Sequence, residues 1–246
     1  NNVEFKIDLS QGDLFIENDG FTYSLSNGGK HIEEADGHSD HDVEPFIGHV
    51  IRTKFLGSSW DGNHFAADSS TFYNNYILGN NSEDWFGHVH GYKSVRMYNY
   101  YDGIDMMLNG DNGLEYSFIV SPQIDVNQIR VNYQGQSKIS VDEDGNLHVG
   151  NRFGEIIESK PIAWVEDQSG RRKKVEVEFK LNGNDLTFEF PNGYDKSKTL
   201  TIDPTLTFST FTGSTSDNWG MTATPDANGN LFGGGISFGI GYPITT

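Results

Sequence analysis

Short segments in which apolar and polar residues alternate recur along almost the whole chain, and they constrain the fold more than any other feature. Alternation with a period of two places every second side chain on one face, which is typical of half-buried antiparallel strands. These segments cover residues 3–8, 21–26, 48–55, 93–100, 115–120, 128–133, 138–142, 147–150, 163–167, 174–181, 185–190, 199–203 and 206–211. No convincing amphipathic helix of three turns lies between them. The sequence therefore predicts an all-β fold in which antiparallel strands stack as a β-sandwich.

Turn residues separate these segments at hairpin intervals. The turns are predicted at residues 18–20, 109–113, 142–146 and 182–185, all rich in Asn, Asp and Gly. Gly and Asn adopt the positive φ angles that tight turns need. Residues 142–146 (DEDGN) and 226–230 (DANGN) also resemble the start of a calcium loop, but Phe153 and Ser237 occupy the twelfth positions, where such a loop needs Glu. We therefore predict hairpin turns and no resident cofactor, with calcium binding only adventitiously to the acidic surface.

Three regions differ from this pattern. Residues 26–44 are acidic and His-rich without aromatics, which predicts a mobile loop. Residues 60–85 show little periodicity, which predicts an irregular excursion on the surface. After residues 201–205 the composition shifts to Gly, Ser and Thr, so we expect a domain boundary near Pro204, with a β-rich domain over residues 1–204 and a separate region over 205–246.

Charge and cysteine content exclude several function classes. The chain has 35 acidic and 17 basic side chains, a formal net charge of -18. Such a charge repels phosphate backbones and anionic lipids, so nucleic-acid binding and membrane-surface binding are not expected. Without any cysteine the chain has no disulfide, thiolate zinc site or cysteine nucleophile. No apolar run is long enough for direct membrane insertion.

An ordered series of motifs carries a resemblance to a known family. The motifs are ENDGFTYSL (17–25), NNYILGNNSEDWFGHVHGY (74–92), YYDGIDMMLNG (100–110), LEYSFIVSP (114–122), IRVNYQG (129–135), GEIIESKPIAW (154–164) and LTIDPTLTFSTF (200–211). Together they resemble the uncharacterised β-rich domain that precedes SBBP-type β-propeller repeats in large secreted proteins of Bacteroidetes. Residues 209–246 resemble the first such repeat. Because one repeat cannot bury its faces alone, we expect the array to continue beyond Thr246.

The resemblance implies an extracellular protein displayed on the cell surface. Its family context is export by the type IX system and association with gliding or adhesion proteins. The partners that it implies are other cell-surface or secretion-system proteins. An exported chain whose signal peptide has been removed would also begin without a leader, as this one does at Asn1.

Histidines provide the first candidate chemistry. His31, His38 and His41 lie in the acidic segment, which has no periodicity to fix a metal geometry. His88 and His90 are two residues apart on an expected strand, so both rings face one side. With His64 or Glu83 they are weak candidates for a metal site, while an ordinary surface strand is the favoured interpretation. A metal-dependent hydrolase centred on His64, His88 and His90 is the least favoured functional hypothesis.

Aromatic residues provide the second candidate. Trp60, Trp85 and Tyr92 lie in or beside the irregular region and could stack on sugars. We interpret Trp164, which alternates with Ile162, as a core residue, and Trp219 as an internal packing anchor. GISFG (235–239) matches a serine-nucleophile pattern only by letter, since no histidine follows His148.

No catalytic residue is therefore predicted, and the chain is not expected to be an enzyme. The leading hypothesis is a non-catalytic structural or adhesion module that contacts other proteins. The alternative is a carbohydrate-binding module that uses Trp60, Trp85 and Tyr92.

Overall fold

The computed structural model describes residues 3–9, 11–27, 46–77, 79–110, 114–204, 206–210, 217–225 and 231–238. The chain divides into two compact units, Asn1–Ser209 and Thr210–Thr246. The described residues contain strands and two short 3₁₀ helices, η1 (Ser82–Asp84) and η2 (Val126–Gln128). The all-β prediction is confirmed.

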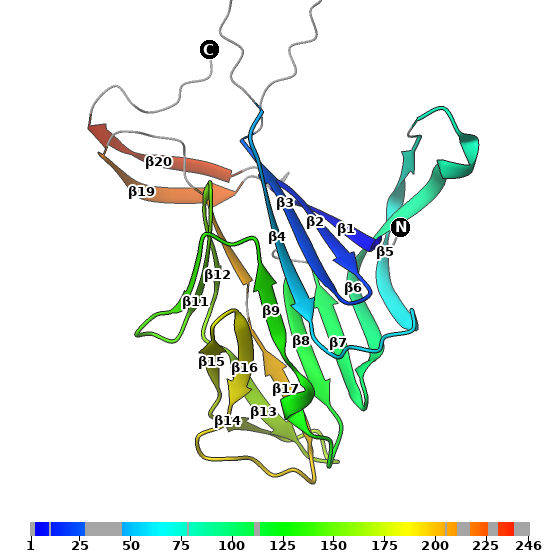
Figure 1. The fold of residues 1–246 in the computed structure, drawn as a ribbon, viewed down its shortest axis with the longest axis vertical. Coiled ribbons are helices and arrows are strands. Elements are labelled where there is room, and N and C mark those ends of the chain that lie inside the picture. The colour runs from blue at the N-terminus through cyan, green and yellow to red at the C-terminus, as the bar shows by residue number, and fades with distance from the viewer. Residues whose placement is uncertain are drawn as a thin grey trace, which may run out of the picture. The chain divides into compact units, whose positions relative to one another are not determined.

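Two seven-stranded antiparallel sheets form most of the first unit (Figure 1). The first sheet has the order β1 (Val3–Leu9), β2 (Gly12–Glu17), β3 (Gly20–Ser26), β4 (Gly48–Phe55), β9 (Val131–Gln134), β16 (Asp185–Glu189) and β15 (Glu178–Asn182). The second has the order β14 (Arg172–Val175), β13 (Ile162–Glu166), β17 (Thr199–Asp203), β8 (Glu115–Val120), β7 (Ile104–Asn109), β6 (Phe86–Tyr101) and β5 (His64–Tyr76).

A smaller sheet and a separate hairpin complete the described strands. The four-stranded sheet has the order β10 (Lys138–Val141), β11 (Leu147–Asn151), β12 (Gly154–Glu158) and β18 (Leu206–Thr210). In the second unit β19 (Asp217–Pro225) pairs with β20 (Leu231–Phe238). Ser237 lies within β20 opposite Asn218, so the strand shows no turn at the serine of the GISFG motif. The identification of this unit as a propeller repeat stays a prediction.

The core lies between the inner faces of the two large sheets. Phe55 of β4 lies edge-on to Phe118 of β8, with ring centroids 6.0 Å apart, and Phe118 contacts Phe188 of β16 at the same distance. Phe21 of β3 contacts Tyr116 of β8 at 5.7 Å. These side chains are among the buried residues that the alternating patterns point inward. The sandwich arrangement thus follows from the period-two pattern.

The two margins of the sandwich are joined in different ways. At one margin the chain passes from β14 of the second sheet to β15 of the first through only Glu176 and Val177, and Val177 is buried. At the other margin, side chains of β1 and β5 make the contact. The ring centroids of Phe5 and His64 are 5.2 Å apart there.

Several turns form where the sequence predicts them. In the β10–β11 turn, the amide of Asn146 donates to Asp142 Oδ1 at 2.8 Å, and Gly145 adopts φ +88°. The β2–β3 and β15–β16 hairpins close with the pairs Glu17–Gly20 and Asn182–Asp185. The mobile-loop prediction for residues 26–44 lies outside the described residues except for Ser26, which ends β3, and Asn27. The turn prediction for residues 226–230 also lies outside them, as do His31, His38 and His41.

Two sequence interpretations are wrong. Residues 64–76, within the predicted irregular excursion, form the thirteen-residue strand β5. Polar Ser and Asn residues and two β-bulges hide its alternation. The core assignment of Trp164 is also wrong, because Ala163 and Val165 face the core while Ile162 is 46% exposed. Trp164 lies on the opposite face, where the guanidinium of Arg172 covers its ring at 4.9 Å.

Candidate functional site

The outer halves of β5 and β6 form a two-stranded arm. Strand β7 pairs with β6 only from Ser94 onward, so residues 69–92 extend past the neighbouring strand. We call residues 69–92 the arm; Figure 1 shows it at the end of the second sheet. Its described side chains are almost all exposed, and they add little to the core.

Large apolar side chains concentrate on this arm. The described residues include twelve exposed large hydrophobic side chains, and seven of them belong to the arm: Phe72, Tyr73, Ile77, Trp85, Phe86, Val89 and Tyr92. Phe72 is the most exposed, at 78%. Single exposed apolar residues are normal on protein surfaces, whereas their concentration on one element makes that element a candidate interaction site.

Polar side chains hold the arm in shape at its bulges. Between Ser69 and Tyr73 the register with β6 shifts. The Ser70 hydroxyl donates to the carbonyl of Phe72 and accepts from the amide of Gly91 at 3.2 Å. At the second shift, Asn75 Oδ1 accepts from the amide of His88 at 3.0 Å. The local Ser and Asn side chains thus replace ladder hydrogen bonds that the bulges interrupt.

The tip of the arm closes with a capped turn. Asn81 Oδ1 accepts from the amide of Glu83 at the start of η1, and the amide of Trp85 donates to the carbonyl of Ser82 at 3.3 Å. The Trp85 indole donates to the carbonyl of Gly79, also at 3.3 Å. These bonds fix the backbone of the tip and the indole of Trp85, a residue that is 44% exposed.

The weak metal candidates are only partly brought together. His88 and His90 both contact the ring of Tyr73, with centroid distances of 4.4 and 5.9 Å. They lie on one side, as their spacing predicts. His64 pairs with Met97, seven residues further along β6 than His90, which corresponds to about 23 Å in an extended strand. Its ring lies against Phe5 and Trp60. Among the described residues no three His, Asp or Glu side chains are grouped to hold a metal.

The three sugar-binding candidates do not form one platform. Trp60 belongs to the core, with 6% exposure, and its indole donates to the carbonyl of Asn63 at 2.8 Å. Trp85 and Tyr92 are exposed on the arm, but seven residues of extended chain separate them by about 23 Å. Only these two rings are available to a ligand.

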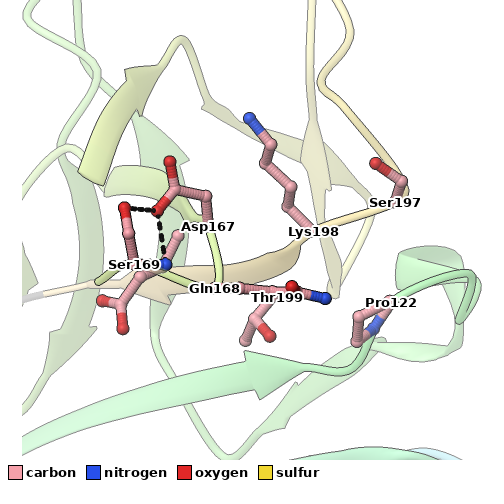
Figure 2. Close-up of a pocket in the computed structure, with 8 residues that line it drawn as sticks. Pro122, Asp167, Gln168, Ser169, Ser197, Lys198 and Thr199 are labelled. Atoms are coloured by element: carbon pink, nitrogen blue, oxygen red, sulfur yellow. Dashed lines mark hydrogen bonds between the residues drawn. The ribbon is translucent and has the colours of Figure 1, made fainter. Parts of the chain in front are cut away.

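A surface hollow near the β13–β14 turn is a further candidate (Figure 2). It is lined by residues 166–169, residues 197–199 and Pro122. Both the hydroxyl and the amide of Ser169 donate to Asp167 Oδ1, at 2.5 and 2.9 Å (Figure 2). These bonds and that from the Arg171 amide lower the pKa of Asp167. Asp167 and Ser169 therefore stabilise the β13–β14 turn through their hydrogen bonds to each other. The residues that line the hollow include no histidine that could activate the serine as a nucleophile.

Sequence reasoning did not identify the most unusual ionisable group. Glu158, at the end of β12, is only 2% exposed. Its two carboxylate oxygens accept hydrogen bonds from the hydroxyls of Tyr116 and Tyr133, at 2.7 and 2.5 Å. Burial raises the pKa of Glu158, and the two tyrosine hydrogen bonds oppose the rise. Burial also raises the pKa of both tyrosines.

The Glu158 cluster joins all three sheets of the first unit. Glu158 belongs to the four-stranded sheet, Tyr116 to β8 of the second large sheet and Tyr133 to β9 of the first. None of the three lines the hollow of Figure 2. The cluster therefore links the three sheets through hydrogen bonds inside the core. The sequence did contain one signal for this cluster. Glu158 is two residues from Ile156 on the same strand, so both side chains face the core, and a buried carboxylate needs a hydrogen-bonding partner.

A membrane-spanning helix is not found within the part of the chain that the structure describes. A family model described as "Domain of unknown function (DUF7948)" matches residues 1–205. No curated protein and no solved structure matches the chain.

Proposed function

The chain belongs to the DUF7948 family of domains of unknown function, and we propose that it is a non-catalytic structural and adhesion module that contacts other proteins through its arm. The observation that carries the proposal is the concentration of seven large exposed apolar side chains on residues 69–92. Aromatic residues, as in this group, are enriched in protein–protein contacts.

The arm's composition supports contact with protein rather than with charged ligands. Residues 69–92 contain no Lys or Arg, and their two acidic residues, Glu83 and Asp84, both lie in η1 at the tip. An apolar surface gains about 25 cal/mol for each Å² that a partner covers. The arm obtains little of this gain within its own fold, because its side chains face solvent.

The extracellular setting forms part of the proposal. It is supported by the motif series that resembles the domain preceding SBBP repeats. In that setting the module would stand at the cell surface among adhesion or gliding proteins. The exposed arm is the part that would meet them.

Site-specific photo-cross-linking tests this proposal. A photoreactive residue replaces Phe72 in the protein on its native cell surface. In the control it replaces Ile162 of β13, which is 46% exposed and lies near the opposite end of the second sheet from β5. We expect protein cross-links at position 72 and few at position 162. Equal labelling at both positions, or none at position 72, would contradict the proposed contact surface.

A further inference from the structure

The most basic segment of this acidic chain lies on an edge strand. Residues 171–174 (RRKK) hold four of the 17 Lys and Arg side chains, so the rest of the chain is even more acidic than the net charge of -18 indicates. Three of the four belong to β14, which is last in its sheet and pairs there with β13. All four residues are exposed. We call residues 171–174 the basic strip; it lies at the opposite end of the second sheet from the arm (Figure 1).

Only one member of the basic strip is neutralised within the fold. The Arg172 guanidinium donates to Glu166 Oε2 at 2.8 Å. For the other three members, Arg171, Lys173 and Lys174, no ion pair with a carboxylate is present among the described residues. These three side chains therefore present positive charge at the edge of the sheet.

The other acidic residues beside the strip are bound to other groups. Glu176 Oε2 accepts a hydrogen bond from the side-chain amide of Asn192. Glu178 pairs with Lys160 at 3.6 Å. Asp167 Oδ1 accepts hydrogen bonds from backbone amides of its own turn. The charge of the basic strip is thus available to a ligand from outside the fold.

Protection of the edge does not by itself explain why all the charges of β14 have one sign. Charged side chains on an edge strand hinder its pairing with other strands. The edges β1 and β15 carry both signs, with Glu4, Lys6 and Asp8 in the first and Glu178 and Lys180 in the second. Mixed charges hinder pairing with strands of either sign, whereas the three positive charges of β14 repel basic strands and attract acidic ones.

We propose that β14 docks an acidic segment of a partner protein, which adds to the sheet as an extended strand and places carboxylates against Arg171, Lys173 and Lys174. The main-chain groups on the side of β14 away from β13 pair with the added strand, as in other cases of strand addition. Hydrogen bonds between carboxylates and Arg or Lys are charge-assisted, which makes them stronger than neutral ones. This surface is separate from the arm, so the inference goes beyond the proposed function.

The length of the basic strip favours a short peptide segment over a long polyanion. Four extended residues span about 13 Å, and charges are screened over about 8 Å at physiological ionic strength. A nucleic acid, an anionic polysaccharide or an anionic membrane extends well beyond this length and would meet the acidic remainder of the chain. An acidic segment of a few residues ends within the strip, so it gains the attraction without this repulsion.

Fluorescence anisotropy with the 246-residue chain tests the inference. The probe is a short labelled peptide of alternating Glu and Thr, and a Gln-Thr peptide of equal length is the neutral control. We expect the acidic peptide to bind about 10-fold or more tightly than the neutral one, and salt to weaken its binding. The double variant Lys173→Glu, Lys174→Glu should weaken binding by about 10-fold or more.

A matched double variant controls for the change in net charge. Lys138→Glu, Arg152→Glu alters the net charge by the same amount at two exposed residues of β10 and the β11–β12 turn. Because these residues lie outside the basic strip, binding of the acidic peptide should weaken by less than about 3-fold. Absence of binding by the acidic peptide, or equal weakening by the two double variants, overturns the inference.

Two further probes test the kind of ligand. Acidic peptides methylated on alternate backbone amides, at odd or at even positions, test the strand pairing: one of the two should lose binding, because its amides cannot donate to β14. If both bind as tightly as the unmethylated peptide, strand addition is wrong. A heparin fragment that binds more tightly than the acidic peptide, and weakens in Lys173→Glu, Lys174→Glu, overturns the inference in favour of an anionic polysaccharide.

Discussion

Replacing Glu158 by Gln tests the role of the buried carboxylate. Because burial raises the folded pKa of Glu158 above its ordinary value of 4.5, the folded state binds the proton more tightly than the unfolded state. The resulting contribution to the free energy of unfolding is complete below pH 4.5 and is lost as pH rises through the folded pKa. Within that window the loss is about 1.4 kcal/mol for each pH unit. Glu158→Gln cannot titrate, so it lacks this component.

The structure also gives the cost of removing the acceptor entirely. Glu158→Ala leaves the buried hydroxyls of Tyr116 and Tyr133 without their carboxylate partner. Each orphaned group costs about 1–3 kcal/mol, so the variant should lose about 2–6 kcal/mol of unfolding free energy. Gln keeps one acceptor oxygen and offers an amide donor to the other hydroxyl, so its loss should be much smaller.

Urea unfolding between pH 4.5 and 8 measures both effects. The wild type minus Gln difference should fall as pH rises, whereas the Ala variant should be destabilised at every pH. The reasoning is refuted if that difference is independent of pH, or if Glu158→Ala costs less than about 1 kcal/mol.

Two further predictions concern a turn and a histidine. Gly103→Ala should lower the unfolding free energy by about 1–3 kcal/mol, because Gly103 has φ +69° and a Cβ there would lie 2.6 Å from Ile124; thermal unfolding unchanged from wild type would contradict this strain. His148 should titrate by NMR above its ordinary pKa of 6.5, because hydrogen bonds to Glu155 and Asp142 favour its charged form. Asp142→Asn should lower that pKa, and the stability that this raised pKa provides should be lost as pH rises through it; an unaltered titration in the variant would exclude the pairing.

Local alternation was enough to predict the fold class. Short alternating segments fix which face of a strand is apolar, and Asn-Gly or Asp-Gly turns fix where hairpins close, as at Gly145 and Gly183. Trp164 shows the limit, because the apolar pattern around it fits either face. Only the packing of Ala163 and Val165 against the core decides between the two faces.

The candidate sites depended on information that the sequence does not hold. The arm looked irregular because its strand is bulged and faces solvent, so no apolar period marks it. Glu158 finds its partners 42 and 25 residues earlier in the chain, on strands of two other sheets. Which distant hydroxyls meet an inward-facing acid is decided by strand order, which no local pattern encodes.

The two margins of the sandwich differ in how firmly they hold the sheets together, and this difference affects where the sheets separate transiently. Where β14 runs into β15, only two residues separate the strands and the layers cannot part without breaking the core around Val177. At the β1 side the two layers meet through a contact between side chains, those of Phe5 and His64. We therefore expect the two sheets to separate transiently first at the margin beside the arm, with Glu176 and Val177 acting as the hinge.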